Sequence, residues 1–338
     1  MNYQEVLERA RKDMGPFCKS CPICDGRACS NHIPGPGAKG SGTVAMRNYQ
    51  AWQQIYVNMD TLVENTEVDT SFQFFGKTLK YPILAGPVGA VASHYSDKYN
   101  DETYNETLVP ACVDAGILAF TGDGKDPEIM KHATSIIKEN HGWGIPTIKP
   151  WAKDVYFEKL QYALDSQAIA VSMDVDAAGL PFLKGCNPPA GRKSVEDLKE
   201  IISNTSVPFI VKGIMTVNGA LKSMEAGASA IVVSNHGGRV LDGCPATASV
   251  LEDIVKVVNG KMMVIVDGGI RSGVDIFKAL ALGADCVMIA RPFVNAIYGA
   301  GKEGVSCLVE KLGQELKGTM EMTGASHLHS IHRSMIMY

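Results

Sequence analysis

Short apolar runs recur along the chain from residue 81 onward, and each is followed by a stretch with helical spacing. The runs are apolar without interruption and rich in β-branched residues, which is typical of strands buried on both faces of a parallel sheet. Eight runs alternating with helices predict an α/β fold, the (β/α)8 or TIM barrel. The runs begin at Tyr81, Ile117, Pro146, Ala168, Pro208, Ala230, Met263 and Cys286.

The helical segments between the runs each end near a glycine. Met224-Glu-Ala-Gly-Ala precedes one run and Ala281-Leu-Gly-Ala-Asp precedes another. Glycine takes the left-handed conformation after a helix at little cost, so these repeats predict helix ends. Between Ser272 and Ala284 the apolar residues share one face, as in a helix packed on the outside of a barrel.

Residues 1–80 do not continue this repeat. They hold a helix-like start, a cysteine-rich segment, a glycine-rich stretch and an amphipathic piece from Tyr49 to Met59. We expect an N-terminal cap over residues 1–80 and a barrel over residues 81–338, in a single domain. After Arg291, one or two helices are expected to close the fold.

Composition and charge indicate a small molecule as the partner. The 338 residues are 46% apolar and 20% charged, with a formal net charge of −4. This charge gives no reason to expect nucleic acid or an anionic membrane as partner, and no apolar run approaches the ~20 residues of a membrane span. The first residues carry charges throughout, unlike a signal peptide, so a cytoplasmic protein is expected.

Polar residues stand where the apolar runs end, and barrels build their chemistry at that end of the strands. The sharpest group is Ser234-Asn-His-Gly-Gly-Arg239, which places a histidine beside a fixed cation. His236 can act as a base, and Arg239 can hold a carboxylate by two parallel hydrogen bonds. Asp174 could orient the imidazole, and Lys212 could place positive charge against a cofactor that becomes negative. Each residue alone is more readily explained as a structural polar group, but three successive strand ends together favour a catalytic site.

A second group predicts a phosphate site. Asp267-Gly-Gly-Ile-Arg-Ser-Gly273 follows the seventh run, and Ala290-Arg-Pro292 follows the eighth. Glycines that free backbone N–H groups, a helix start and two arginines at these strand ends suit a phosphate. A simple tight turn would explain the glycines but not both arginines.

These segments resemble the FMN-dependent 2-hydroxy-acid oxidase and dehydrogenase family, which includes glycolate oxidase, lactate oxidase and mandelate dehydrogenase. The first strand also resembles the family's segment beside the flavin. The stretches that carry the resemblance are PILAGPVGA, IVKGIMTVNGA, AIVVSNHGGRVLDGCPAT, VIVDGGIRSGVDIFKALALGAD and IARPF.

The resemblance implies FMN at the carboxyl-terminal face of the barrel. His236 would remove the substrate's hydroxyl proton as hydride passes to flavin N5, with Asp174 supporting His236 and Arg239 binding the substrate carboxylate. Lys212 would stabilise the reduced flavin, and Asp267 would meet the ribityl chain. Pro87, Val88 and Gly89 would contact the ring, and Gly269, Arg271, Ala290 and Arg291 would hold the phosphate. Thr121, Lys149, Ser172, Ser234, Gly237 and Gly268 are also expected in the cofactor site.

The substrate half of the site departs from the family. Pro150 stands where the family has a tyrosine after the third strand, no tyrosine of the cap aligns well with the family's other one, and the family's arginine after Asp174 is missing. A flavin-dependent isomerase or reductase is therefore an alternative to hydroxy-acid oxidation. A non-catalytic flavin protein is a weaker alternative, and a barrel of the inosine monophosphate dehydrogenase class would need a cysteine where His236 stands. The electron acceptor is open among oxygen, a quinone and a protein, and the resemblance implies a homotetramer or larger homo-oligomer.

Four cysteines lie close together in the cap, as Cys18-x2-Cys21-x2-Cys24-x4-Cys29. Thiolates bind both Zn2+ and iron–sulfur clusters, but the last spacing differs from the bacterial ferredoxin pattern and the two separated pairs of a zinc ribbon are missing. Metal binding and reduced or redox-active thiols are equally compatible with the pattern. An iron–sulfur cluster would imply a route for electrons to or from FMN. A zinc ion would imply a cap that is cross-linked by the metal over the site.

Overall fold

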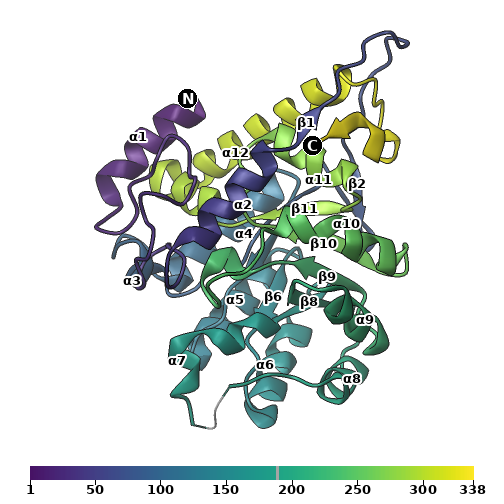
Figure 1. Ribbon diagram of the computed structural model, residues 1–338. Coiled ribbons are helices and arrows are strands. Elements are labelled where there is room, and N and C mark those ends of the chain that lie inside the picture. Colours follow the sequence, from purple (N-terminus) through teal and green to yellow (C-terminus); the bar gives the residue numbers. More distant parts are fainter. Residues whose placement is uncertain (188–189) are drawn as a thin grey trace.

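A closed barrel of eight parallel strands forms the centre of the computed structural model, which describes residues 1–187 and 190–338 (Figure 1). The strands follow one another around the barrel in chain order, and the last pairs with the first. All eight apolar runs contribute strands, so the predicted (β/α)8 fold is confirmed. The strands are β4 (Ile83–Ala85), β5 (Leu118–Thr121), β6 (Ile145–Ile148), β7 (Val171–Asp174), β8 (Phe209–Ile214), β9 (Ala230–Val233), β10 (Met263–Asp267) and β11 (Cys286–Ile289).

Alternate residues of the strands point into the barrel or toward the surrounding helices. Ile210 belongs to the interior cluster, whereas its neighbour Val211 packs in the layer between strands and helices. Phe74 and Leu79 of a hairpin also join the interior cluster and close the amino-terminal end of the barrel. The opposite end is left for a ligand. The hairpin consists of β2 (Phe72–Phe74) and β3 (Lys77–Leu79).

Helices surround the barrel and end as the glycine pattern predicts. Gly227 and Gly283 follow their helices in the left-handed region, with φ of 90° and 96°. The closing segment is one element, α12, with a break at Ala300 and Gly301. In the described ranges, no helix combines the length and apolarity needed to cross a membrane. The helices are α4 (Asp101–Asp114), α5 (Pro127–Glu139), α6 (Lys153–Asp165), α8 (Val195–Ser203), α9 (Val217–Glu225), α10 (Thr247–Val258), α11 (Gly273–Ala281) and α12 (Arg291–Glu321), with two short ones, α3 (Val91–His94) and α7 (Pro181–Lys184).

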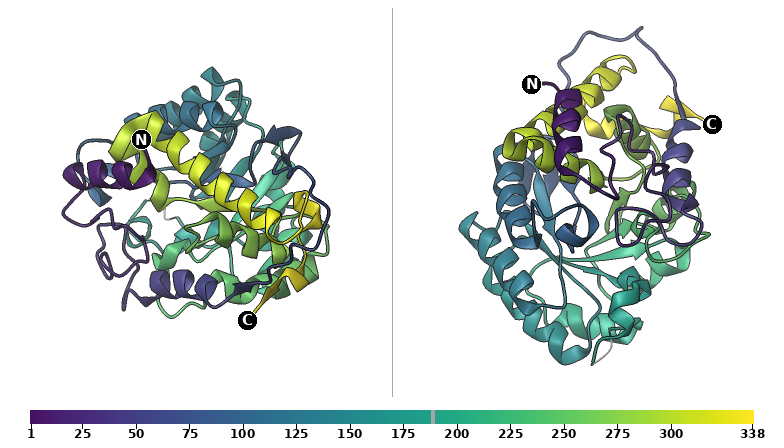
Figure 2. Two further views of the ribbon diagram at one scale, coloured as in Figure 1. Left: turned by 90° about the horizontal axis from the view of Figure 1, so that it is seen from above. Right: turned by 90° about the vertical axis from the view of Figure 1, so that its left-hand side faces the viewer.

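The segment before the barrel packs onto it at several places. α1 (Tyr3–Asp13) packs on α12, and α2 (Thr43–Gln53) packs against α10. The helix α2 starts and ends earlier than the amphipathic piece expected at residues 49–59, because Gly42, in the left-handed region, precedes it. β1 (Tyr56–Val57) pairs antiparallel with β12 (Ile336–Met337), so the end of the cap is joined to the carboxyl-terminal end of the chain, whereas the N-terminus lies on another side of the molecule (Figure 2).

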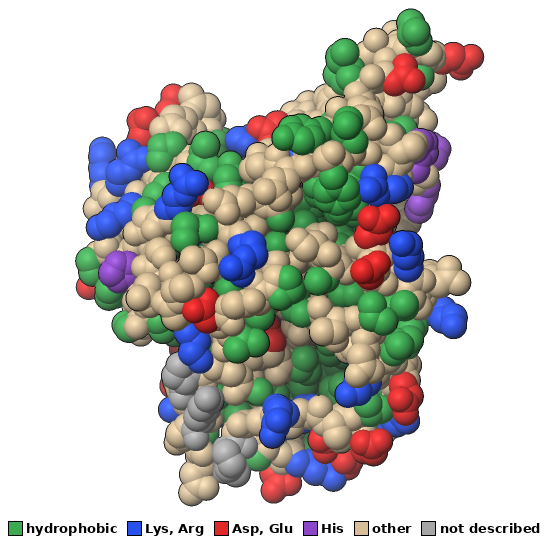
Figure 3. Space-filling model, viewed as in Figure 1, with side chains coloured by type: hydrophobic (Ala, Val, Ile, Leu, Met, Phe, Trp, Pro, Cys, Tyr) green, Lys and Arg blue, Asp and Glu red, His purple; other side chains and the backbone are tan. Residues whose placement is uncertain are grey.

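The loop between β1 and β2 projects from the body of the molecule (Figure 3). It carries apolar side chains that are strongly exposed, since Met59 is 70%, Leu62 96% and Val63 49% exposed. Apolar groups clustered on a projecting loop are typical of a contact surface.

Candidate active site

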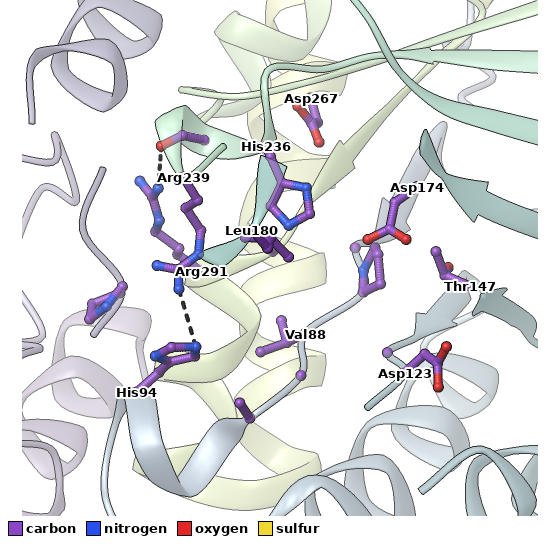
Figure 4. A pocket seen from close by; sticks show the side chains of 18 of the residues that line it. Val88, His94, Asp123, Thr147, Asp174, Leu180, His236, Arg239, Asp267 and Arg291 are labelled. Atoms are coloured by element: carbon purple, nitrogen blue, oxygen red, sulfur yellow. Dashed lines mark hydrogen bonds between the residues drawn. The ribbon is translucent and has the colours of Figure 1, made fainter. Parts of the chain in front are cut away.

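A cavity of about 590 Å³ lies at the carboxyl ends of the barrel strands. Its volume suits a cofactor together with a small substrate. Figure 4 shows His236, Asp174 and Asp267 in one part of the cavity, and Arg239, Arg291 and His94 in another. Most predicted site residues line it: Pro87, Val88, Gly89, Lys149, Asp174, Lys212, His236, Gly237, Arg239, Asp267, Gly268, Gly269, Arg271, Ala290 and Arg291. Thr121, Ser172 and Ser234 are not among the lining residues and lie fully buried at their strand ends.

His236, the predicted base, is held by Asp176. Its Nδ1 lies 3.0 Å from Oδ1 of Asp176, which stands in a 3-10 turn, η1 (Val175–Gly179), directly after β7. Burial raises the pKa of Asp176, but the charges of Lys212 and His236 outweigh burial and hold that pKa below its usual value. The carboxylate is therefore ionised and fixes the proton of the neutral ring on Nδ1, which leaves Nε2 as the basic atom.

Asp174, which the sequence suggested as the partner of His236, is paired with Lys149 instead. Nζ of Lys149 donates to Oδ2 of Asp174 at 3.2 Å, and both side chains are buried. Burial raises the pKa of Asp174, against the opposing charges of Lys149 and His236. In this structure the hydrogen bond to the ring comes from Asp176, because the turn after β7 brings the later carboxylate to Nδ1, while a carboxylate oxygen of Asp174 lies within 4.8 Å of the same group.

Lys149 lies in the cavity, whereas the neighbouring Pro150 is not among the residues that line it. The residue directly before the position of the family's tyrosine therefore places a cation in the site.

Lys212, Ser234 and Asp267 form a buried network next to His236. Nζ of Lys212 donates to Oγ of Ser234 at 3.3 Å and lies 3.9 Å from Oδ2 of Asp267. The Ser234 hydroxyl donates to Asp267 at 2.8 Å, and its oxygen accepts the backbone N–H of His236 at 3.1 Å. Burial lowers the pKa of Lys212, but the nearby carboxylates of Asp176 and Asp267 outweigh it and raise that pKa. The network keeps a fixed positive charge at the bottom of the cavity.

The residues predicted to bind phosphate lie at one edge of the cavity. Arg291 begins α12, and its Nη2 donates to the carbonyl oxygen of Gly237 at 2.8 Å. Arg271 follows β10, and its Nε donates to the carbonyl oxygen of Cys24 at 2.7 Å. Two guanidinium groups beside a helix start form a site for an anion. Gly269 also lets the cap approach, because a Cβ there would lie 2.3 Å from the carbonyl oxygen of Asn48 in α2.

Arg239 joins the barrel to the cap. Its Nη1 donates to the carbonyl oxygens of Gly35 and Gly37 at 2.5 and 3.1 Å, and its Nη2 lies 3.1 Å from Nε2 of His94. The backbone N–H of Gly35 also donates to Nδ1 of His94 at 2.9 Å. A neutral imidazole accepts only one hydrogen bond, so the two donors compete for His94. Burial, followed by the charge of Arg239, lowers the pKa of His94 to about 4 and keeps the ring neutral.

Asp123 is a cavity residue that sequence reasoning missed. Its carboxylate accepts hydrogen bonds from Nζ of Lys159 at 2.5 Å, Nε1 of Trp151 at 2.6 Å and the backbone N–H of Lys149 at 3.0 Å. It therefore joins the loops after β5 and β6 and fixes the backbone at Lys149. The available clue was an acidic residue between two glycines, Gly122 and Gly124, directly after a predicted strand.

Comparison with known proteins agrees with this geometry. The sequence pattern of the family described as FMN-dependent dehydrogenase matches residues 35–181 and 188–338. The chain belongs to this family. The peroxisomal (S)-2-hydroxyacid oxidase GLO3 of Arabidopsis thaliana is 31% identical over 323 residues, covering 86% of each chain. The 4-hydroxymandelate oxidase of Amycolatopsis orientalis is 30% identical over 348 residues, covering 91% of this chain and 95% of that one.

Solved structures show the same likeness across nearly the whole FMN-dependent dehydrogenase chain. A mandelate oxidase variant with 2-hydroxy-phenylacetamide superposes with a TM-score of 0.80 at 25% identity and covers 98% of this chain and 97% of that one. A second mandelate oxidase variant, with the C4a-OH-FMN adduct, superposes with a TM-score of 0.76 at 27% identity, covering 97% of each chain. The chain is thus an FMN-dependent oxidoreductase, and these relatives give no support to an isomerase or reductase.

Polar atoms at the strand ends of this FMN-dependent dehydrogenase fit the cofactor. The hydroxyl oxygens of Thr121, Thr147 and Ser172, on three successive strands, are buried without a hydrogen-bond partner among the described residues. Buried polar groups are normally hydrogen bonded, so a row of unpaired ones indicates the place of a polar ligand. Together with Lys212 on one side and the two arginines on the other, the residues present fit FMN.

The four cysteines of the cap lie outside this cavity and line a smaller one beside it. All four are free thiols, three of them partly exposed and Cys29 buried. The pattern of the FMN-dependent dehydrogenase family begins at residue 35, so the cysteines precede the matched region.

Proposed function

We propose that the protein oxidises a 2-hydroxy acid, with His236 removing the hydroxyl proton and Arg239 binding the carboxylate. The observation that carries this proposal is the hydrogen bond between Nδ1 of His236 and the ionised Asp176. It leaves Nε2 as the base in a cavity that also contains the Arg239 guanidinium. An acidic proton and a carboxylate on one small substrate match these two groups.

FMN, when bound, accepts the hydride from the substrate carbon. Lys212 holds positive charge where reduction adds negative charge, and the Ser234 and Asp267 network keeps its ammonium group in place. Pro87, Val88 and Gly89, which line the cavity, are proposed to contact the ring. Thr121 and Ser172 lie behind the cavity wall, and their unpaired hydroxyl groups are proposed to reach the polar edge of the ring by turning toward the cavity when the cofactor binds. Gly268, Gly269, Arg271, Ala290 and Arg291 are proposed to hold the phosphate.

Asp176 is a positioning residue in this proposal, because it acts through His236. Its negative charge stabilises the imidazolium that forms when the hydroxyl proton moves to Nε2. The Lys149 and Asp174 pair lies in the same cavity. The ammonium group of Lys149 balances the negative charge of Asp174, so that this charge does not act on His236 unpaired. Lys149 is proposed to contact a polar group of the substrate.

The substrate's side chain is proposed to be apolar. Val88, Leu180 and Phe182 line the cavity, and Phe182 lies where the match to the family pattern is interrupted, between residues 181 and 188. Apolar walls with few polar groups favour an alkyl or aryl substituent over a charged one. The named activities of the relatives, on hydroxymandelate and other 2-hydroxy acids, agree with this class.

Residues 1–80 are proposed to act as a cap that excludes water from the site. Pro36, Ala45 and Asn48 line the cavity, and the backbone N–H of Lys39 donates to the carbonyl oxygen of Gly238 at 2.8 Å. The carboxylate of Asp242 accepts both the backbone N–H and the hydroxyl of Ser41, at 2.7 and 2.8 Å. These bonds close the cap over the loop that carries His236.

A cytoplasmic homo-oligomer is the proposed state of the protein. The exposed Met59, Leu62 and Val63 on the projecting loop offer an apolar contact surface, and nine thiols without a disulfide suit a reducing compartment. Light scattering of the purified protein checks the assembly, and the molar mass of a single chain would contradict it.

The experiment that tests the activity follows the absorption of the oxidised flavin during anaerobic addition of a panel of 2-hydroxy acids. We expect one class of acid to bleach the flavin, and His236→Ala to lose this bleaching while retaining FMN. His132→Ala is the matched control, because His132 lies on α5 and pairs with the exposed Glu106. Unchanged bleaching in His236→Ala, or no bleaching by any acid, would refute the proposal.

A further inference from the structure

Four cysteines of the cap face one narrow cavity beside the flavin pocket. Cys18, Cys21, Cys24 and Cys29 all line it, although eleven residue positions separate the first from the last. Such convergence is not needed to close the cap, which is already held by Arg239 and Asp242. The cysteines also precede the matched part of the chain, so the family's own chemistry does not account for them.

The loop that carries the thiols is held in place by the protein around it. The Ser20 hydroxyl donates to the carbonyl oxygen of Leu7 at 3.0 Å, and Nη2 of Arg11 donates to the carbonyl oxygen of Ser20 at 3.0 Å. Sγ of Cys18 lies 3.6 Å from Oδ1 of Asn295 on α12. The loop is thus held both by hydrogen bonds of its backbone and Ser20 and by contacts of the thiols of Cys18 and Cys29 themselves.

The spacing of the thiols does not suit a single metal ion. Zinc binds thiolates at about 2.3 Å, which brings the sulfurs of a tetrahedral site to about 3.8 Å from one another. In residues 1–187 and 190–338, the group of three or more possible ligands whose atoms lie within 4.8 Å of one another is Asp174, Asp176 and His236, not a set of cysteines. A cluster binds each thiolate at a different iron and so holds its four sulfurs further apart.

Positive charge is present at the cavity to balance such a cluster. Nη2 of Arg271 lies 3.7 Å from Sγ of Cys24, and its Nε donates to the Cys24 carbonyl oxygen at 2.7 Å. Arg291 lines the same cavity. Four thiolates around a cluster carry net negative charge, which two guanidinium groups in a partly buried site offset.

We propose that Cys18, Cys21, Cys24 and Cys29 bind a [4Fe–4S] cluster that carries electrons away from the flavin. The wall between the two cavities is thin, since Pro36, Tyr95 and Arg291 line both. Arg271 also reaches both, because it lines the flavin pocket and contacts Cys24. The cluster site therefore lies directly behind the phosphate arginines.

The electron route rests on the proposed function, whereas binding of the cluster does not. Oxidation of one hydroxy acid leaves two electrons and a proton on the flavin. The electrons pass singly through the cluster, each reducing it by one unit before it is reoxidised by a one-electron carrier protein. Two carriers are reduced for each substrate, and the flavin proton goes to solvent.

The first test is the metal content and electron paramagnetic resonance spectrum of the complete protein, purified without oxygen and reconstituted with iron and sulfide. We expect about four irons and four sulfides per chain, and a signal from the reduced cluster after dithionite. Cys21→Ser should lose iron and the signal but retain FMN, since Cys21 makes no side-chain hydrogen bond among the described residues. Cys186→Ser is the matched control, because Cys186 lies on the loop after α7 and lines neither cavity.

Each outcome separates the cluster from the activity. A reconstituted protein without iron, or with about one zinc per chain, would overturn the cluster. A dithionite signal without any flavin bleaching by a hydroxy acid would leave the cluster in place and remove the proposed activity. Flavin bleaching by a hydroxy acid in anaerobic protein that leaves the cluster oxidised, with an added one-electron carrier staying oxidised as well, would overturn the electron route.

Discussion

Replacing Asp176 by Asn tests which carboxylate controls the base. The substitution keeps the size of the side chain but removes the negative charge 3.0 Å from Nδ1 of His236. It also lets the amide present its N–H to the ring, which favours the wrong tautomer. The pair is largely shielded from water, since the side chains of His236 and Asp176 are 19% and 8% exposed, so solvent does not replace the lost charge.

The size of the effect follows from the bond that is lost. A hydrogen bond to a charged group contributes roughly 1.5–3 kcal/mol, and about 1.4 kcal/mol corresponds to a tenfold change in rate. We expect kcat/KM for Asp176→Asn to fall roughly 10- to 150-fold.

The assay is kcat/KM for flavin reduction in wild type, Asp176→Asn and Asp174→Asn. Asp174→Asn breaks the pair with Lys149 but leaves the hydrogen bond of His236 intact, so its kcat/KM should fall less than that of Asp176→Asn. If Asp174→Asn lowers kcat/KM by roughly 10-fold or more and Asp176→Asn does not, the assignment of the orienting carboxylate is refuted.

Three further substitutions test other parts of the structure. Arg291→Ala should weaken FMN binding by roughly 10- to 100-fold through loss of a charged contact to phosphate, measured by fluorescence titration against Arg27→Ala as an exposed control; equal affinities would contradict the phosphate site. The pKa of His94 falls from 6.5 to about 4 on folding, so the unfolded chain binds a proton first and stability is lost as pH falls from about 6.5 toward 4. Urea denaturation of the holoenzyme at pH 7 and pH 5 should show a smaller loss in His94→Gln than in wild type, and equal losses would argue against a neutral ring. Gly269→Ala should destabilise the fold by about 1–3 kcal/mol, because its Cβ would meet the backbone of Asn48; an unchanged melting temperature would show that the cap does not pack there.

The barrel could be predicted because its strands are buried on both faces. A run such as Ala230-Ile-Val-Val is apolar at every position, and this signal needs no knowledge of distant contacts. The cap could not be predicted in the same way. Its strands have only two or three residues, and β1 is defined by its pairing with β12 from the other end of the chain. Such a partner leaves no periodic pattern in the local sequence.

The site was predictable where it depends on strand ends and not where it depends on turns. Lys212 lies at the end of an apolar run, Arg291 follows one, and His236 stands in the distinctive group Ser234-Asn-His-Gly-Gly-Arg239. Asp176 was missed because it comes two residues after Asp174, inside a 3-10 turn whose direction the sequence does not indicate. His94 was missed because it belongs to a short helix after β4 and reaches Arg239 only through the fold of the cap.

The pairing of β1 with β12 also means that this part of the fold can form only after the whole chain has been synthesised. β1 leaves the ribosome before any barrel strand exists, whereas its partner is made after the last of them. At about 5–20 residues per second, the nearly 280 residues between them take roughly 15 to 60 seconds to synthesise. Throughout that time β1 lacks its partner strand, so chaperones and neighbouring nascent chains meet this segment before it can pair.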